Sequence, residues 1–357
     1  MSKNKVLMCG NEACGEGAMA AGCTFYAGYP ITPQNELISY MAKRINETDG
    51  AFVQAESELA AISMVLGAAA AGVRAMTSSS SPGISLKQEG ISYLSACELP
   101  CVIVNMQRGG PGLGNIAPSQ SDYFQAVKGG GHGDYKLIVL APMSVQELFD
   151  LTFLAFDLAD KYRNPVFILG DGLLGQMMEP LVISSDMRPT HYDKPWALTG
   201  CKGRKPGIIR SLLLGDGVLE AHNRHMQDKF SLIKKTETRV QHFNTRDADI
   251  ILVAYGSVAR IAKAAMESAR AKGLKVGFIR PITLWPFPDK AIEDASAHAG
   301  KFLVVEMSAG QMVEDVRLAV NGKAKVEFYG RMGGGVPCEE EILACVEASL
   351  KSGGAAR

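Results

Sequence analysis

Two prolines bracket the first residue whose chemistry stands out, Thr32. In the stretch Tyr29-Pro30-Ile31-Thr32-Pro33, each proline fixes its own φ near about −65° and removes a backbone donor. Each also disfavours a helical conformation at the residue before it. The apolar spacing of Leu37, Ile38 and Met41 predicts a helix directly after this stiff loop. A hydroxyl held here can cap that helix or bind an anion beside its positive end, and the residues alone leave both open.

Two carboxylates, Glu56 and Glu58, open a second predicted helix over 55–72 that is apolar on nearly all its faces. Acidic residues in the first turn of a helix are favoured by the helix dipole, which is the simpler explanation. A carboxylate leading into an all-apolar helix is also a candidate for a raised pKa and a specific partner.

Arg108 and a run of serines each follow a predicted strand. The polar loop 78–83 ends the strand over 73–77, and Gln107, Arg108 and a glycine-rich stretch end the strand over 101–106. Ligands of open α/β sheets gather at the carboxyl ends of strands. We therefore expect Thr32, the serine loop and Arg108 to lie at one edge of the sheet, where a guanidinium suits a carboxylate.

Alternating strands and helices position these residues. Strands are expected over 6–9, 51–54, 73–77, 101–106, 137–140 and 165–169, and helices over 55–72, 84–96, 121–126 and 144–161. The strand over 6–9 is expected to be buried, with a glycine turn at 10–17 opening a helix after it. This alternation predicts an α/β fold with a doubly wound parallel sheet.

A second, smaller α/β domain is expected toward the C-terminus. Prolines and scattered charges from 175 to about 245 indicate an irregular linking segment on the surface. Strand patterns then return over 249–257, 275–279, 302–306 and 324–329. We therefore divide the chain into residues 1–178, 179–245 and 246–357.

The composition argues against several classes of function. The 37 basic residues equal the 37 acidic ones, which argues against a broad nucleic-acid-binding surface. No apolar stretch approaches the roughly 20 residues needed to span a bilayer. The N-terminus has no signal-peptide pattern, so a cytoplasmic location is expected.

The eight cysteines do not indicate a metal site. None form a Cys-x-x-Cys pair, and no histidine lies at zinc-finger spacing. Most lie in apolar contexts, so we expect buried structural thiols and neither a metal nor an iron–sulfur cluster on this chain. The glycine turn at 10–17 also lacks the G-x-G-x-x-G spacing of a dinucleotide site.

In their order and spacing, the Tyr29–Pro33 loop, the Glu58 helix start, the serine loop and Arg108 resemble one family. This is the α subunit of the 2-oxoacid:ferredoxin oxidoreductases, the pyruvate synthase superfamily. The stretches 253–257 and 280–288 resemble the transketolase C-terminal-like domain of that family. The runs 78–85 and 109–115 look nearest to the branched-chain members, which act on 3-methyl-2-oxobutanoate (2-ketoisovalerate).

The resemblance implies that the first domain binds the aminopyrimidine half of thiamine diphosphate. Alignment backward from Gly72 places Glu58, not Glu56, at the glutamate that hydrogen-bonds the pyrimidine nitrogen. An apolar helix start suits this role because desolvation makes a shared proton favourable. The other positions matching cofactor-binding residues are Pro30, Ile31 and Ser81.

The same resemblance assigns the substrate carboxylate to Thr32 and Arg108, a fixed hydroxyl and a bidentate guanidinium. It implies oxidative decarboxylation of a 2-oxoacid with coenzyme A, with electrons passing through iron–sulfur clusters to ferredoxin. It also implies β and γ/δ-type partner subunits and an α–α contact within a hetero-oligomer.

The residues that would hold the diphosphate are missing from this pattern. The chain contains Gly170-Asp171-Gly172 and Gly215-Asp216-Gly217, but no asparagine pair follows either one at the family's spacing. We interpret both as turns. The diphosphate, its magnesium and the iron–sulfur clusters are then expected on partner subunits, and the isolated chain is expected to be inactive.

Substrate preference rests on the segment after Arg108. From Gly109 to Val127 there is no lysine or arginine to pair with a second carboxylate, whereas Leu113 and Ile116 offer apolar contacts. This favours a branched aliphatic 2-oxoacid, although His132 or a partner subunit could also line the pocket. The alternatives are a 2-oxoglutarate enzyme, a catalytically silent structural subunit and a nucleotide-dependent oxidoreductase.

Overall fold

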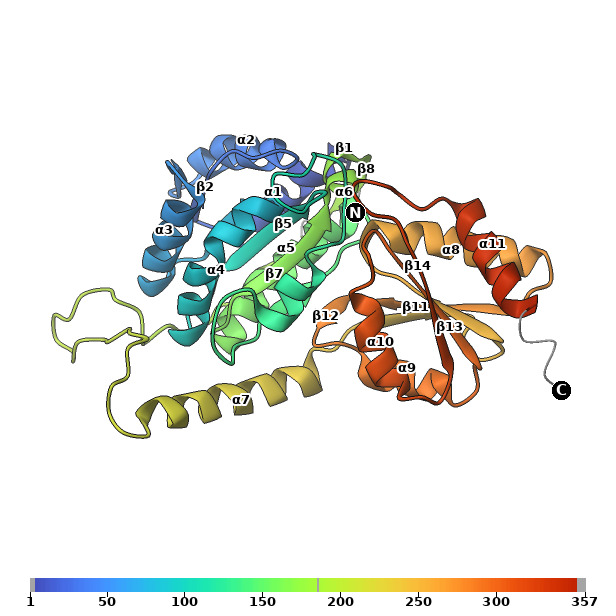
Figure 1. Ribbon diagram of the computed structural model, residues 1–357. Helices are drawn as coiled ribbons and strands as arrows, with labels where there is room; N and C mark the ends of the chain where they lie inside the picture. Colours follow the sequence, from blue (N-terminus) through green and yellow to red (C-terminus); the bar gives the residue numbers. More distant parts are fainter. Residues whose placement is uncertain (1–3, 185, 352–357) are drawn as a thin grey trace.

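The computed structural model describes residues 4–184 and 186–351 and contains two α/β units built on separate large sheets (Figure 1). The first sheet has the order β12-β6-β7-β5-β4-β2-β3. Its strands are β2 (Phe25–Gly28), β3 (Ala51–Gln54), β4 (Ala75–Ser79), β5 (Val102–Gln107), β6 (Ile138–Leu140), β7 (Val166–Asp171) and β12 (Thr283–Trp285). All of these pairs are parallel except β12 with β6, so the predicted parallel sheet gains one antiparallel edge strand from the second unit.

Helices cover this sheet in two groups. Helix α1 packs against α2 and α5, whereas α3 packs against α4. Their bounds are α1 (Gly10–Ala20), α2 (Asn35–Arg44), α3 (Glu58–Ala70), α4 (Ser81–Ala96), α5 (Val145–Tyr162) and α6 (Gly172–Gln176), with a 3-10 turn η1 (Ile45–Glu47) after α2. This doubly wound arrangement confirms the predicted fold class.

The second unit is built on a five-stranded sheet of order β14-β13-β10-β11-β9. Its strands are β9 (Val240–Phe243), β10 (Ile250–Val253), β11 (Val276–Pro281), β13 (Lys301–Glu306) and β14 (Lys325–Gly330). Its helices are α8 (Gly256–Ala271), α9 (Asp289–Ser296), α10 (Met312–Val320) and α11 (Glu339–Lys351). Only β9 pairs in the antiparallel direction within this sheet.

The strand order of the first sheet reverses between β2 and β4. The chain passes from β2 to β3 at one edge, and then crosses back to β4 on the other side of β2. A crevice at the carboxyl ends of the strands is expected at such a reversal. The Thr32 loop follows β2, and the run of serines begins in the last two residues of β4, so both lie at this crevice.

Several predicted elements are wrong in detail. The strand β1 (Asn4–Cys9) is not buried in the main sheet; it pairs antiparallel with β8 (Met178–Ile183) in a two-stranded sheet, and its Leu7 is 64% exposed. A short apolar run does not distinguish a core strand from such an outer ribbon. Strand β2 was not predicted, and β7 lies inside the sheet, between β6 and β5.

Two helix starts also differ from the prediction. Helix α4 begins at Ser81, not at 84, because Pro82 fits the first turn of a helix, where no backbone donor is needed. The helix predicted over 121–126 is instead centred on a π-helical turn, η2 (Gln125–Gly129).

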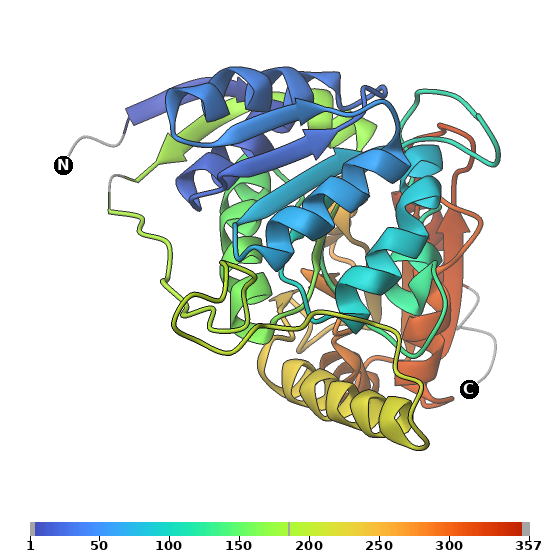
Figure 2. The same ribbon diagram turned by 90° about the vertical axis from the view of Figure 1, so that its left-hand side faces the viewer.

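The segment 179–245 is not irregular throughout. It contains β8, β9 and the helix α7 (Val218–Thr236), which buries Met226, Phe230 and Ile233 along one stripe. The irregular part lies between β8 and α7, where it crosses the outside of the first unit (Figure 2). It contains Pro189, Pro195 and Pro206, which are typical of irregular structure, and the helical period of α7 follows them.

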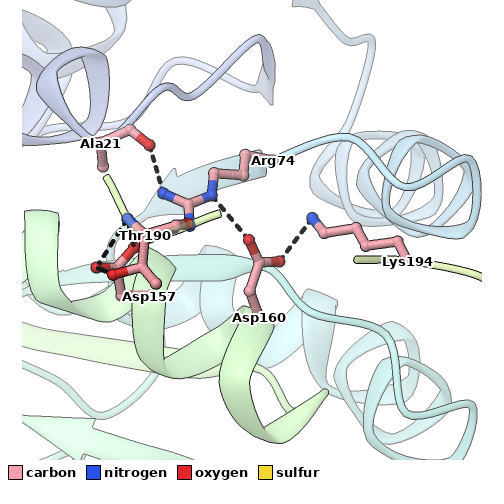
Figure 3. Close-up of polar contacts among 6 residues, drawn as sticks. All are labelled: Ala21, Arg74, Asp157, Asp160, Thr190 and Lys194. Atoms are coloured by element: carbon pink, nitrogen blue, oxygen red, sulfur yellow. Dashed lines mark hydrogen bonds and ion pairs between the residues drawn. The ribbon is translucent and has the colours of Figure 1, made fainter. Parts of the chain in front are cut away.

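Arg74 ties this irregular segment to the first unit (Figure 3). Its Nε donates to Asp160 and its Nη2 to Asp157, both on α5 and both at 2.8 Å. Its remaining bonds go to the carbonyls of Ala21 and Thr190. Lys194 pairs with the second oxygen of Asp160 at 2.6 Å. Every guanidinium nitrogen of Arg74 therefore has an acceptor.

Candidate functional site

Arg108 and the Thr32 loop meet at the edge of the first sheet, as predicted. Arg108 is 7% exposed; its Nη1 donates to the Thr32 carbonyl at 2.9 Å and its Nη2 to the Leu113 carbonyl at 3.1 Å. Its Nε is buried with no partner, and within the described ranges no carboxylate pairs with this guanidinium. Carbonyl oxygens do not neutralise the positive charge of a buried guanidinium, so Arg108 can still bind an anionic ligand.

The Thr32 hydroxyl does not cap α2. That helix begins at Asn35, and the residue before it, Gln34, makes no side-chain cap bond. The Thr32 Oγ1 instead accepts a bond from the Asn35 side chain at 3.3 Å, which leaves its own hydrogen to donate. Capping is therefore wrong for this hydroxyl, and anion binding stays a prediction.

Gln34 is a polar residue at the crevice that the sequence analysis missed. It is fully buried, and its Oε1 accepts a hydrogen bond from Ser78, which in turn bonds the Tyr26 hydroxyl. Its Nε2 has no partner, and neither have the buried hydroxyls of Ser79 and Ser80. Buried polar groups without partners are rare, so these atoms mark where a ligand can complete the bonding.

Glu58 is the first residue of α3 and is only 6% exposed, whereas Glu56 is exposed. Ser57 already caps this helix by accepting a bond from the Ala60 amide at 3.2 Å. A methyl group on Gly83 would lie 2.6 Å from Glu58 Oε1, so the glycine lets α4 approach the carboxylate. Helix capping therefore does not explain the burial of Glu58.

Lys87, one turn after Gly83 on α4, is the second residue that the sequence analysis missed. It has no exposed surface, and its Nζ donates to Thr77 Oγ1 at 2.7 Å. Burial lowers the pKa of Lys87 to about 7, and the carboxylate of Glu58 acts against that change. Its place within the apolar spacing of α4 is the only sequence signal for its burial.

Ser81 joins the start of α4 to the end of β5. Its Oγ donates to Asp122 at 2.6 Å and accepts from the Arg108 amide at 3.0 Å, and its own amide donates to Asn105. Burial raises the pKa of Asp122. These bonds fix the orientation of the Ser81 side chain. The other two residues predicted to contact the cofactor differ in exposure: Ile31 is half-buried and Pro30 is exposed.

A pocket of about 700 Å³ opens beside Ser81, between the two units. The residues lining it are Ser81, Pro82, Ser85, Gly110, Pro111, Gly112, Ser119, Ser121, Asp122, Met307, Ser308, Ala309, Gln311, Met332 and Gly333. The predicted substrate contacts Leu113 and Ile116 are not among them and are 81% and 64% exposed. His132 lines a different pocket, of about 410 Å³.

Asp171 in the first Gly-Asp-Gly is a helix cap. Its Oδ1 accepts from the amides of Leu173 and Leu174, and its Oδ2 accepts from Ser257 at 2.6 Å. Burial raises the pKa of this carboxyl. In residues 4–184 and 186–351, no group of three or more His, Cys, Asp or Glu side chains is arranged to hold a metal ion.

The cysteines are only partly as predicted. Cys14 and Cys23 are buried, and burial raises the pKa of each to about 12. Cys101 is also buried, but Cys201 and Cys338 are exposed, so the buried-thiol interpretation is wrong for those two. Both lie in polar, glycine- or proline-containing stretches that place them at the surface.

Two family models match the chain in succession. Residues 16–242 match the thiamine-diphosphate-binding domain of pyruvate flavodoxin/ferredoxin oxidoreductase, and residues 248–342 match core domain II of pyruvate:ferredoxin oxidoreductase. The chain belongs to the 2-oxoacid:ferredoxin oxidoreductase family. The first unit is thus the thiamine-diphosphate-binding domain of a family member.

Curated relatives of this family match nearly the full length. The ketoisovalerate oxidoreductase subunit VorB of Methanothermobacter marburgensis is 52% identical, over 94% of this chain and 95% of its own. The 2-oxoglutarate synthase subunit KorA of Methanothermobacter thermautotrophicus is 39% identical, over 94% and 96%.

Solved structures support the same family fold. The 2-oxoglutarate:ferredoxin oxidoreductase from Magnetococcus marinus, with 2-oxoglutarate, coenzyme A and succinyl-CoA bound, is 29% identical and superimposes with a TM-score of 0.88. That match covers 98% of this chain and 66% of the longer one. A split-gene transketolase, 15% identical with a TM-score of 0.62, shares the fold. No helix in the described part of the chain has the length and apolarity to cross a membrane.

Proposed function

We propose that this chain is the α subunit of a 2-oxoacid:ferredoxin oxidoreductase that acts on 3-methyl-2-oxobutanoate. The enzyme would decarboxylate the acid oxidatively with coenzyme A, and pass the electrons to ferredoxin. The supporting observation is Arg108, a buried guanidinium with no acidic partner in the described residues, held against the Thr32 loop. A 2-oxoacid carboxylate would supply the missing anion.

The crevice fits the aminopyrimidine half of thiamine diphosphate. Gly83 lets α4 lie close to the buried Glu58 carboxylate, and the buried hydroxyls of Ser79 and Ser80 have no partner among the described residues. When bound, thiamine diphosphate supplies the carbon nucleophile and the electron sink for decarboxylation. Glu58 would hold a proton against the pyrimidine nitrogen, with Ser81, Pro30 and Ile31 lining the ring.

Thr32 and Arg108 would orient the substrate through its carboxylate. A fixed hydroxyl and a guanidinium fork together constrain both the position and the plane of a carboxylate. The Arg108 Nη atoms are already held by two carbonyls, so the fork does not have to be ordered when the substrate arrives.

The remaining components belong, in this proposal, to partner subunits. The described residues include no cluster suited to magnesium, and the Asp171 carboxylate is occupied by two amides and Ser257. The β and γ/δ-type subunits would therefore hold the diphosphate, its magnesium and the iron–sulfur clusters. An α–α contact would join two copies within the hetero-oligomer.

The branched substrate is favoured over 2-oxoglutarate for two reasons. The ketoisovalerate subunit shares 52% identity, against 39% for the 2-oxoglutarate subunit. The nearest cation beyond the segment after Arg108, Lys128, already pairs with Asp315. Leu113 and Ile116 would meet the aliphatic end of the substrate at a surface that a partner subunit completes.

Viologen reduction by the co-expressed complex tests this function. With coenzyme A present, we expect the highest kcat/KM for 3-methyl-2-oxobutanoate among that acid, pyruvate and 2-oxoglutarate. A preference for 2-oxoglutarate would overturn the substrate assignment but keep the reaction class. No reduction with any of the three acids, in a complex that has all its subunits and cofactors, would favour a silent structural subunit.

A further inference from the structure

Lys87 is buried without a paired carboxylate. It has no exposed surface, and its one hydrogen bond goes to the hydroxyl of Thr77. Across the described ranges no carboxylate lies within ion-pair distance of its ammonium. A buried charge in this situation either depends on a nearby opposite charge or loses its proton.

Glu58 is the opposite charge that acts on Lys87. Gly83 and Lys87 are four residues apart on α4 and so share one face of the helix, and Gly83 contacts the Glu58 carboxylate. The neighbouring strands β4 and β5 carry no ionisable side chain, α3 carries only Glu58, and the acidic Glu89 of α4 is exposed. The charge of Lys87 is therefore set by burial and by Glu58.

We propose that Lys87 is a positioning residue that controls the charge of Glu58. Its ammonium supplies the positive charge that acts on the Glu58 carboxylate while the cofactor pocket is empty. When the aminopyrimidine binds, one N–H bond of the ammonium breaks, the amine becomes neutral, and one proton is held between Glu58 and the pyrimidine nitrogen. This inference rests on the proposed function, because it requires Glu58 to bind that nitrogen.

The proton count follows from this arrangement. Below the pKa of Lys87, about 7, the pocket holds one proton before binding, on Lys87, and one after binding, at Glu58, so no proton is gained or lost in that range. The lowered pKa of Lys87, near 7, is in keeping with an amine that can give up its proton in that range. Binding of the cofactor nevertheless gives up the attraction between the ammonium and the carboxylate.

The variant Lys87→Met removes the ammonium and so tests whether this attraction opposes cofactor binding. Without the ammonium there is no attraction to Glu58 to give up, so the variant complex should bind thiamine diphosphate more tightly at about pH 6.5, by about tenfold for each pKa unit of coupling. Near about pH 9, well above the pKa of Lys87, the amine is neutral in both states, and the two affinities should converge. A loss of packing alone would weaken binding equally at both pH values.

The affinity is measured by titrating cofactor-free complex calorimetrically at the two pH values. The matched control is Lys229→Met: burial also lowers the pKa of Lys229, but this lysine pairs with Glu98 away from the crevice. Its affinities should equal those of the wild type at both pH values. An equal ratio of variant to wild-type affinity at both pH values for Lys87→Met would overturn the proposal.

Two further variants keep the test decisive. If Lys87→Met does not assemble, Thr77→Val removes the acceptor of the ammonium and should give a smaller gain near pH 6.5; no gain would count against the proposal. In a Glu58→Gln background, the gain from Lys87→Met should disappear. If Glu58→Gln itself retains full turnover, the proposed role of Glu58 fails, whatever Lys87 does.

Discussion

Two arginines in the same domain, the largely buried Arg74 and the buried Arg108, follow opposite bonding patterns. Arg74 makes four hydrogen bonds, two of them to the carboxylates of Asp157 and Asp160 (Figure 3). Arg108 bonds two carbonyl oxygens and leaves its Nε without a partner. The first arginine is compensated within the chain, and the second is not.

The acidic residues show the same contrast. Asp160 pairs with both Arg74 and Lys194, whereas Glu58 is buried at a crevice with no ion pair in the described part of the chain. Compensated charges hold the irregular segment onto the first unit. Uncompensated ones gather at the reversal of strand order, where a ligand can supply the missing partner. This contrast predicts which substitutions affect catalysis and which affect stability.

Glu58→Ala should have the largest effect. Removing a group that exchanges a proton with the cofactor typically costs about 10²–10⁴-fold in rate, and the folded complex should persist because Ser57 still caps α3. Turnover of 3-methyl-2-oxobutanoate by the reconstituted complex measures this loss. The control is Glu56→Ala, at an exposed position two residues earlier, which should lose far less activity. Equal losses would show that the alignment that assigns the cofactor contact to Glu58 and not to Glu56 is wrong.

Arg74→Met should act on stability instead. Asp157 and Asp160 would be left without their main partner, and breaking a buried ion pair costs about 3–5 kcal/mol. Urea denaturation should show this decrease in the free energy of unfolding, while the KM of the assembled enzyme stays unchanged. Arg224→Met, which breaks an exposed pair with Glu220, should change stability by less than about 1 kcal/mol. A large rise in KM for Arg74→Met would contradict the distinction between charges that stabilise the fold and charges that bind the substrate.

Arg108→Met should have the opposite effect to Arg74→Met: it should weaken substrate binding and not stability. Loss of a charge-assisted bond to the substrate carboxylate is worth about 1.5–3 kcal/mol, or roughly 10- to 100-fold in kcat/KM, mainly through KM. The free energy of unfolding should stay the same or rise, because no acid within the described ranges is left unpaired. A destabilisation like that of Arg74→Met would mean that Arg108 is structural.

The sequence was sufficient to predict where the uncompensated groups meet. Thr32 and Arg108 follow parallel strands, whose carboxyl ends share one edge of the sheet, although β2, the strand before Thr32, was not itself predicted. Lys87 and Gln34 were missed because burial of a polar side chain depends on neighbours far away in sequence, such as Glu58 for Lys87 and Ser78 for Gln34. The division at 178 and 245 stays a prediction.

Pairings between strands that lie far apart in the sequence were also missed. The strand β12 joins the first sheet only through β6, more than a hundred residues earlier in the chain, and β1 pairs with β8 from the far end of the first unit. Neither partner is visible in a local pattern of apolar residues. Helix α7 does have a local pattern of apolar residues, but the prolines before it favoured the prediction of irregular structure.

Glu98 is intermediate between the fully compensated charges around Arg74 and the uncompensated ones at the crevice. It gives the smallest predicted effect. Burial works to raise the pKa of this carboxyl, but the charges of Lys229, His225 and Arg163 outweigh it and hold the pKa below its usual value. Lys229 Nζ donates to Glu98 Oε1 at 3.1 Å, which links α7 to the first unit.

Because the pKa of Glu98 is lower in the folded chain than in the unfolded one, its contribution to stability is present above the unfolded pKa and is lost as the pH falls through the folded one. Glu98→Gln should therefore lower the free energy of unfolding by about 1 kcal/mol at neutral pH, and the difference from the wild type should shrink as the pH falls below the ordinary glutamate pKa of about 4.3. Urea denaturation at neutral pH and below that pKa measures it, with the exposed Glu89→Gln as the control. A difference that persists at low pH would show that Glu98 acts through packing, not through its charge.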